Sequence, residues 1–329
     1  HVAKLSDPIG RTLKSWRRPN GLRISQVTVP LGVIFIVYES RPNVTSECAS
    51  LCLKSGNAVL LRGGREARHS NRAIVQVYRE VLNSFRLPEA SVTLVSVPDR
   101  RAIDLLLKLE DFINLAIPRG GEALIRRVAR NARVPVIKHY HGICHVYVDR
   151  AADLEMALKI ALNAKCQRPA VCNAMETLLV HRSIASRFLP RYGVLLRQAG
   201  CEIRGDQTTR RLIAGSKQAT EEDWRTEYLD RILSIRVVRD LDQAIEHIQK
   251  FGSAHTDSIV TESQAAARKF VSRVDSSSVM VNASTRFSDG FEYGFGAEIG
   301  ISTDKVHARG PMGLEGLVSY KYVVRGAGH

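Results

Sequence analysis

Residues 33–38 read VIFIVY and run directly into Glu39-Ser40-Arg41-Pro42-Asn43 and a helix-compatible segment over residues 44–54. Because every side chain of VIFIVY is apolar or aromatic, a strand formed there is buried on both faces, which is typical of a parallel sheet covered by helices. The polar residues that follow lie at the carboxyl end of this strand, where ligands of open α/β sheets collect. This stretch predicts an α/β fold with a binding site at the strand end.

The same alternation of short apolar runs and helical segments continues along the chain. Further strands are expected at Ala58–Leu61, Val92–Val97 and Phe112–Ile117, and helices at Asn71–Phe85, Arg101–Leu109 and Glu122–Ala132. A second series begins with a strand at His145–Asp149 and a helix at Ala152–Ala164, and it extends to Ser278–Val281. We therefore predict two α/β domains, each with a largely parallel sheet, over residues 1–143 and 144–305.

Two segments near the ends alternate polar and apolar residues, namely Leu22–Val29 and Val318–Val324. Alternation of this kind is typical of exposed strands, which can pair across subunits. We predict a small oligomerisation β-segment that consists of a hairpin at residues 18–32 and a C-terminal return and strand at residues 306–329. A homo-oligomer is the expected assembly.

Composition and charge exclude several classes of protein. The formal charge of +15 favours anionic partners, but with only 6% aromatic residues and dispersed basic residues no platform for stacking bases is evident, so we expect no nucleic-acid binding. The longest apolar run, Pro30–Tyr38, is strand-sized, so no membrane span is expected. The first residues lack the apolar core of a signal peptide, and a cytoplasmic location is the expectation. Six unevenly spaced cysteines predict reduced thiols rather than a disulfide framework.

Two cysteines, Cys166 and Cys172, lie between the expected helix and the apolar run Thr177–Val180. A thiol in a loop near Lys165 and Arg168 has a route to thiolate character and thus to nucleophilic catalysis. The alternative is an inert packing group, because most lone cysteines behave as small apolar residues. From the local sequence alone both interpretations stay open.

Three short segments carry weaker signals. Arg62-Gly63-Gly64 and Gly120-Gly121 follow expected strands, where glycines let the backbone approach a phosphate, although ordinary turn glycines explain each pair equally well. Asn43 fits a helix N-cap or a donor to an oxyanion. The stretch His139–His145 contains three histidines and Cys144, but its spacing matches no usual zinc motif, so we interpret it as strand and predict no metal.

Longer motifs resemble the gamma-glutamyl phosphate reductases, a branch of the aldehyde dehydrogenase superfamily, and together they span essentially the whole chain. The matching residues are 30–33 (PLGV), 38–45 (YESRPNVT), 51–58 (LCLKSGNA), 117–121 (IPRGG), 172–179 (CNAMETLL), 226–230 (TEYLD), 282–287 (NASTRF), 294–302 (GFGAEIGIS) and 307–311 (HARGP). The resemblance implies an aldehyde-dehydrogenase-like fold in which residues 1–143 bind NADPH and residues 144–305 hold the nucleophile. Members of this family generally begin with further helices, so we expect that upstream helices are missing here.

The resemblance also implies roles for individual residues. Cys172 matches the nucleophile, and Asn43 matches the amide that joins the nucleophile's own N–H in an oxyanion hole. The implied cofactor contacts are Arg62, Gly63 and Gly64 at the adenosine ribose and phosphate, Gly120 and Gly121 at the pyrophosphate, and Glu227 at the nicotinamide ribose. Asn282, Ser284, Thr285 and Arg286 fall on the substrate-anchoring loop of the superfamily.

The implied reaction is the reduction of L-glutamyl 5-phosphate to L-glutamate 5-semialdehyde through a thioester on Cys172, the second step of proline biosynthesis from glutamate, with possible coupling to glutamate 5-kinase. Acid-forming relatives carry a general-base Glu in a Glu-Leu-Gly-Gly segment, and the corresponding residues 135–142 (PVIKHYHG) contain no carboxylate, which favours reduction. Lys138 stands where a small residue is expected and could alter cofactor fit. The alternatives are a semialdehyde dehydrogenase that forms the acid and an inactive assembly subunit with the same fold.

Overall fold

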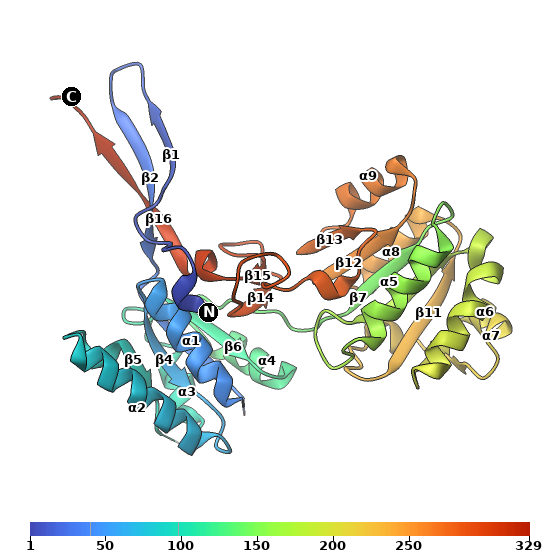
Figure 1. The fold of residues 1–329 in the computed structure, drawn as a ribbon, viewed down its shortest axis with the longest axis horizontal. Helices are drawn as coiled ribbons and strands as arrows, with labels where there is room; N and C mark the ends of the chain where they lie inside the picture. The colour runs from blue at the N-terminus through green and yellow to red at the C-terminus, as the bar shows by residue number, and fades with distance from the viewer. Residues whose placement is uncertain (40, 98) are drawn as a thin grey trace. The chain divides into compact units, whose positions relative to one another are not determined.

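The computed structural model describes residues 1–39, 41–97 and 99–329, so Ser40 of the motif at 38–45 lies outside the described residues. The chain forms two compact units, residues 1–138 with 293–329 and residues 139–292 (Figure 1). Our predicted boundaries lay after residues 143 and 305. The units divide earlier because Ile143 N donates to Ser253 Oγ of the second unit at 3.0 Å, whereas Ala297 and Ile299 are buried in the core of the first.

The first unit is built on a four-stranded parallel sheet in the order β5-β4-β3-β6. Along β3, Ile34 and Ile36 pack into one core, while Phe35 and Val37 pack into the core on the opposite face. The predicted strand buried on both faces is thus confirmed. The elements are β3 (Val33–Tyr38), α1 (Pro42–Lys54), β4 (Ala58–Arg62), α2 (Arg68–Ser84), η2 (Glu89–Ser91), β5 (Val92–Leu94), α3 (Arg101–Leu106), β6 (Leu115–Arg119) and α4 (Glu122–Asn131).

Helices α1 and α2 contribute buried residues to one face of this sheet, and α3 and α4 to the other. The strand expected from Phe112 begins only at Leu115, because the N–H groups of Phe112 and Ile113 donate to Leu109 O in a turn. Phe112 is correspondingly exposed. The paired part of β5 ends at Leu94, three residues before the predicted end of that strand.

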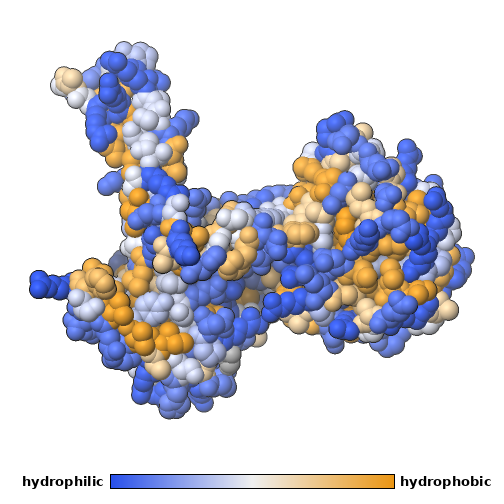
Figure 2. All heavy atoms as spheres, viewed as in Figure 1, coloured by the Kyte–Doolittle hydropathy of each residue, from blue (hydrophilic) through white to orange (hydrophobic). Residues whose placement is uncertain are grey.

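A three-stranded antiparallel sheet, β1-β2-β16, belongs to the same unit. The hairpin occupies residues 12–30, whereas we predicted 18–32, because Thr12–Arg17 pairs with β2. Apolar and hydrophilic side chains lie next to each other on this sheet in Figure 2, and Tyr320, Tyr322 and Val324 are exposed. The remaining elements of the unit are η1 (Val2–Lys4), β1 (Thr12–Arg17), β2 (Arg23–Pro30), β14 (Gly300–Ser302), β15 (Gly310–Met312), η5 (Leu314–Leu317) and β16 (Val318–Arg325).

The second unit is built on a seven-stranded parallel sheet in the order β10-β9-β11-β8-β7-β12-β13. Its elements are β7 (Cys144–Val148), α5 (Leu154–Cys166), β8 (Met175–His181), α6 (Arg182–Gln198), β9 (Glu202–Gly205), α7 (Gln207–Leu212), β10 (Lys217–Gln218), η3 (Asp223–Arg225), β11 (Ile232–Val238), α8 (Leu241–Phe251), β12 (Thr256–Val260), α9 (Gln264–Arg273), β13 (Ser278–Val281) and η4 (Thr285–Phe287).

Helices α5 and α6 pack into the core on one face of this sheet, and α8 and α9 pack on the other. The two parallel sheets confirm the predicted fold class. Within the described residues, no helix is both long and apolar enough to span a bilayer.

Candidate active site

Cys172 lies in the connection between α5 and β8, at the amino edge of the seven-stranded sheet. Cys172 is half-buried, whereas Cys48, Cys52, Cys144 and Cys201 are buried. The predicted competitor, Cys166, is the last residue of α5 and not a loop residue, because the helix extends two residues beyond its predicted end. A hydrogen bond with Cys201 lowers the pKa of the Cys166 thiol to about 7, so Cys166 is also a candidate for thiolate chemistry.

The residue after Cys172 ties its loop to η4. Asn173 Nδ2 donates to Ser288 O at 2.9 Å, and the Arg286 guanidinium donates to Asn173 Oδ1. Arg286 Nε also donates to Gln167 Oε1 at 3.1 Å, at the other end of the loop. Arg286, one of our predicted substrate-anchoring residues, therefore contacts the Cys172 loop at both ends and holds it.

Two histidines lie beside Cys172: His139, which we interpreted from the sequence as a strand residue, and His255, which the sequence did not single out. The ligand atoms of His139, Cys172 and His255 lie within 4.8 Å of one another, at the amino ends of the adjacent strands β7, β8 and β12. His139 is not in a strand as we had interpreted it, because β7 begins only at Cys144. Burial, followed by the proximity of His139, lowers the pKa of His255 to about 3, so this imidazole is neutral.

Glu227 reaches the same loop through Gly142. Its Oε1 accepts from Gly142 N at 2.9 Å, and a Cβ built on Gly142 would lie 2.5–2.6 Å from the carbonyl carbon and Cα of Cys172. His141 Nδ1 is 3.9 Å from the other carboxylate oxygen. Gly142 thus links Glu227 to the backbone of Cys172, although Cys172 and Glu227 lie 55 positions apart in the sequence.

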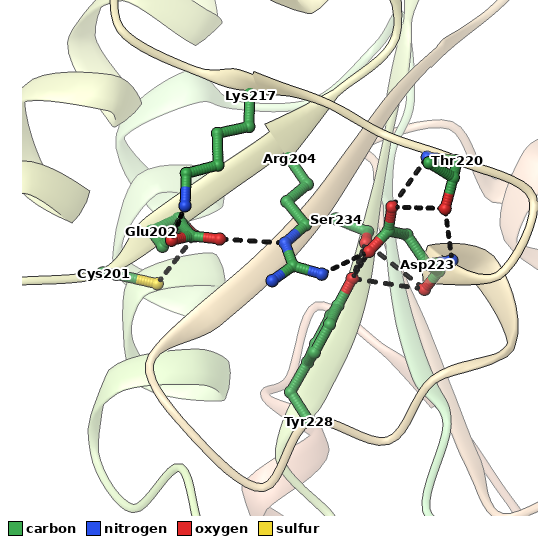
Figure 3. A network of polar contacts seen from close by, with 8 residues as sticks. All are labelled: Cys201, Glu202, Arg204, Lys217, Thr220, Asp223, Tyr228 and Ser234. Carbon is green, nitrogen blue, oxygen red and sulfur yellow. Dashed lines mark hydrogen bonds and ion pairs between the residues drawn. The ribbon is translucent and has the colours of Figure 1, made fainter.

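A polar network fixes the segment that carries Glu227 (Figure 3). Tyr228 Oη lies 2.8 Å from both Asp223 Oδ1 and Ser234 Oγ, and Arg204 donates to Asp223 Oδ1 at 2.6 Å. Burial alone would raise the pKa of Asp223, but the hydrogen bonds from Arg204, Thr220 and Tyr228 outweigh it and lower that pKa to about 2.

A buried ion pair supports the same segment from the sheet. Lys165 Nζ lies 2.6 Å from Glu176 Oε2, both side chains are fully buried, and Glu176 Oε1 accepts from Leu229 N at 3.2 Å. Burial raises the pKa of Glu176 to about 7, while Lys165 opposes this shift. Sequence position suggested Lys165 as an activator of a thiol, but its ammonium group points to Glu176. It couples the end of α5 to the segment that carries Glu227.

The other predicted substrate-anchoring residues have different environments. Asn282 is exposed, and its amide exchanges hydrogen bonds with Thr261 N and O at 2.9 and 3.0 Å. Ser284 is buried, and its hydroxyl accepts from Arg286 N at the start of η4. Thr285 is fully buried, and its hydroxyl has no hydrogen-bond partner among the described residues. Of the four predicted residues, Arg286 is the one that the structure ties directly to the Cys172 loop.

In the first unit, the carboxyl ends of β3 and β4 line a cavity of about 1020 Å³. Arg62, Gly63 and Gly64, our predicted contacts for the adenosine end of a cofactor, line it together with Arg65 and Arg100. Burial, then the charges of Arg65 and Arg100, lower the pKa of Arg62. Gathered cations at a strand end form a site where an anionic group relieves the repulsion. Gly63 also packs closely against Asn71 and Tyr38, which leaves no room for a side chain there.

The second predicted phosphate turn already carries an anion. Glu39 Oε2 accepts from Gly121 N at 3.0 Å, ahead of the first residue of α4, and a side chain on Gly120 would collide with Glu39. The turn thus binds a carboxylate through its N–H, the same chemistry that a pyrophosphate needs.

The structure also shows the surroundings of Asn43 and Lys138. The N-cap of α1 is Arg41, and Pro42 occupies the first turn, so the N-cap interpretation of Asn43 is wrong. Proline suits this position because its fixed φ is helical and it needs no N–H partner. Asn43 is exposed. Lys138 Nζ pairs with Asp304 at 3.1 Å.

Comparisons with known proteins show the family of the chain. Residues 4–210 match the family model described as "Aldehyde dehydrogenase family". A curated gamma-glutamyl phosphate reductase from Carboxydothermus hydrogenoformans is 59% identical over 327 residues, which are 99% of this chain and 79% of the relative.

Solved structures give the same result. The crystal structure of gamma-glutamyl phosphate reductase from Thermotoga maritima matches with a TM-score of 0.98 at 52% identity, covering 100% of this chain and 79% of that one. An acetylating aldehyde dehydrogenase from Geobacillus thermoglucosidasius shares the fold, with a TM-score of 0.71 at 18% identity over 97% of this chain and 80% of that one. The chain therefore belongs to the aldehyde dehydrogenase family and, within it, to the gamma-glutamyl phosphate reductases.

Proposed function

We propose that this chain reduces L-glutamyl 5-phosphate to L-glutamate 5-semialdehyde and phosphate with NADPH, as the second step of proline biosynthesis from glutamate. The observation that carries the proposal is the loop at Cys172: a half-buried thiol at a strand edge, held by Arg286 through Asn173 and contacted through Gly142 by Glu227. The names of the relatives supply the substrate, and the loop supplies a nucleophile for it.

In the proposed reaction the Cys172 thiolate attacks the carbonyl carbon of the acyl phosphate, the C–O bond to phosphate breaks, and a thioester forms on sulfur. When bound, a nicotinamide would supply the hydride for the reduction of this thioester. Breaking the C–S bond of the resulting thiohemiacetal then releases the aldehyde and regenerates the thiolate. Asn43 stays our proposed donor to the developing oxyanion, together with the N–H of Cys172.

The family implies a nicotinamide cofactor, and we extend this to NADPH. The support is the group of arginines that lines the cavity of the first unit, because a guanidinium fork binds a 2′-phosphate in a bidentate manner. Arg62, Gly63 and Gly64 would hold the adenosine end, and Gly120 and Gly121 the pyrophosphate, for which Glu39 would have to leave Gly121 N. Glu227 would bind the nicotinamide ribose.

A coupled assay tests the direction of the chemistry. With glutamate semialdehyde and NADP⁺, we expect NADPH formation that requires inorganic phosphate. Turnover to glutamate without phosphate would instead identify an acid-forming dehydrogenase. Absence of both turnover and NADPH binding would identify an assembly subunit.

The nucleophile is tested by a pair of cysteine variants. Cys172→Ala should abolish turnover and retain NADPH binding, because the cavity lies in the other unit. Cys166→Ala is the matched control and should change the rate little, although its thiol has the lowered pKa. Exchange of these two outcomes would move the chemistry to Cys166.

We also propose that the chain forms a homo-oligomer through the β1-β2-β16 sheet. The support is its exposed face, where Tyr320, Tyr322 and Val324 present apolar area to solvent. Light scattering that finds a monomer at micromolar concentration contradicts this. A cytoplasmic location and a functional coupling to glutamate 5-kinase complete the proposal, and co-purification with the kinase tests the latter.

A further inference from the structure

The cluster of His139, Cys172 and His255 has the composition of a metal site. One sulfur and two imidazole nitrogens are ligands that Zn²⁺ prefers, and the three atoms lie within 4.8 Å of one another. In a tetrahedral zinc site, ligand atoms are separated by about 3.5 Å, given bond lengths of about 2.0–2.3 Å. The cluster therefore has to contract by about 1 Å, a movement that a half-buried side chain such as His139 can make.

His255 is the fixed member of the cluster. Its ring is fully buried, and its Nδ1 lies 2.9 Å from Thr256 Oγ1 and 3.7 Å from Cys144 Sγ. Its Nε2 is buried and has no hydrogen-bond partner among the residues that the structure describes. When Nδ1 donates to Thr256 Oγ1, Nε2 carries the lone pair that can bind a metal. Metal-bound histidines are usually oriented in this way, by a hydrogen bond from the ring nitrogen that does not bind the metal.

The two rings approach from different directions. The centroids of His139 and His255 are 5.5 Å apart, and the ring planes are inclined at 73°. Convergent ligands from three strand ends suit a tetrahedral ion, and the fourth position is left for water. A site with three protein ligands keeps its fourth position for an exchangeable ligand, whereas a structural site is closed by four protein ligands.

We infer that His139, Cys172 and His255 form a reversible Zn²⁺ site that blocks the nucleophile. Binding replaces the thiol proton by the metal, so one S–H bond is lost, one Zn–S and two Zn–N bonds form, one proton is released and nothing is oxidised. The sulfur lone pair that would attack the acyl phosphate is then held by the metal. The blocking role rests on the proposed function, whereas the metal site itself does not.

The site can be tested without turnover. Co²⁺, a spectroscopic substitute for Zn²⁺, is titrated into the reduced, metal-free full chain, and Zn²⁺ affinity is measured by competition with a chromophoric chelator. We expect one ion per chain, a sulfur-to-cobalt charge-transfer band, and release of one proton per ion. Cys172→Ala should remove the band, and His139→Ala, which removes a ligand at a half-buried position, should weaken Zn²⁺ at least about 100-fold.

Two further variants act as controls. Cys166→Ala keeps all three ligands and should leave the affinity and the band unchanged. Thr256→Val removes only the hydroxyl beside His255 and should weaken Zn²⁺ by about 10-fold, the usual effect of losing a partner of a metal-bound histidine. Circular dichroism checks that each variant is folded.

The outcomes separate the site from the enzyme activity. Zn²⁺ binding that survives in Cys172→Ala, or a band that disappears in Cys166→Ala, overturns the site. If Zn²⁺ binds, reductase turnover should be lost and a chelator should restore it. Zn²⁺ binding that leaves reductase turnover unchanged overturns the blocking role. A cobalt site with the expected spectrum in a chain without reductase activity supports the metal site and overturns the proposed function instead.

Discussion

Adding one methyl group at Gly142 tests how the backbone of the nucleophile is held. In Gly142→Ala the new Cβ would lie 2.6 Å from Cys172 Cα and 2.5 Å from its carbonyl carbon, where carbon atoms in contact normally lie about 3.5–4.0 Å apart. The atoms it meets are main-chain atoms, which cannot rotate away. The Cys172 backbone must therefore move by about 1 Å relative to Gly142, while the Gly142 N–H that donates to Glu227 is retained.

A displacement of this size is expected to reduce kcat by about 100-fold, because near-attack geometry tolerates little error. Overpacking should also lower the free energy of unfolding by about 1–3 kcal/mol. Phosphate-dependent NADP⁺ reduction measures the first effect, and calorimetry measures the second. NADPH binding should change little, because the Gly142 N–H that holds Glu227 is retained and the arginines of the cavity are untouched.

Gly300→Ala is the matched control, because Gly300 is also buried and its added Cβ meets only the Arg119 side chain at 3.4 Å. This variant should be close to wild type in kcat. The reasoning is refuted if Gly142→Ala retains wild-type kcat and thermal stability, since the main-chain apposition would then be absent. Equal loss of activity in both variants would also refute it.

Three further predictions concern other parts of the molecule. Arg286→Lys keeps the charge but loses the guanidinium fork that contacts Gln167 and Asn173, so kcat should fall at least tenfold in initial-rate assays. A rise in KM alone would mean that Arg286 only binds the substrate carboxylate. The pKa of Asp223 is lowered to about 2 in the folded chain, so its contribution to stability, at most about 2 kcal/mol, is complete above about pH 4 and is lost as pH falls towards 2. Thermal unfolding of Asp223→Asn should therefore lack this decrease in stability between about pH 4 and about pH 2. An unchanged pH dependence would contradict the assignment. Arg65→Ala should raise the KM for NADPH about tenfold and leave that for NADH unchanged, as expected for one charged contact to a 2′-phosphate; equal effects on both would count against NADPH preference.

Local patterns in the sequence were sufficient for the α/β class. The run VIFIVY specifies a strand buried on both faces, and the structure divides its side chains alternately between two cores. The motif around Cys172 also singled out one thiol among six, and that thiol is half-buried in a loop. The first inference rests on strand periodicity, and the second on the resemblance of residues 172–179 to a family motif; both use residues that are close together in the chain.

Element ends were less well predicted, for identifiable reasons. The strand expected at Phe112 starts three residues later because a turn captures the intervening N–H groups, and α5 continues through Cys166 because nothing in its sequence stops the helix earlier. Asn43 looked like an N-cap, but Pro42 already occupies the first turn of the helix. At the strand and at Asn43 neighbouring residues occupy the backbone position that the local pattern had assigned, whereas in α5 no residue ends the helix.

The sequence by itself determined the alternation of strands and helices, the family motifs and the choice of Cys172 as the candidate nucleophile. Tertiary packing alone set which side chains surround that thiol: His139 and His255 come from segments ahead of two other strands. Lys165 pairs with a buried Glu176, although its charge also lowers the pKa of Cys166. Hydrophobic periodicity specifies which face of an element is buried, but strand order and register decide which distant residues meet at the sheet edge. Chemistry assembled from residues far apart in the chain is therefore visible only after the strands have been placed side by side.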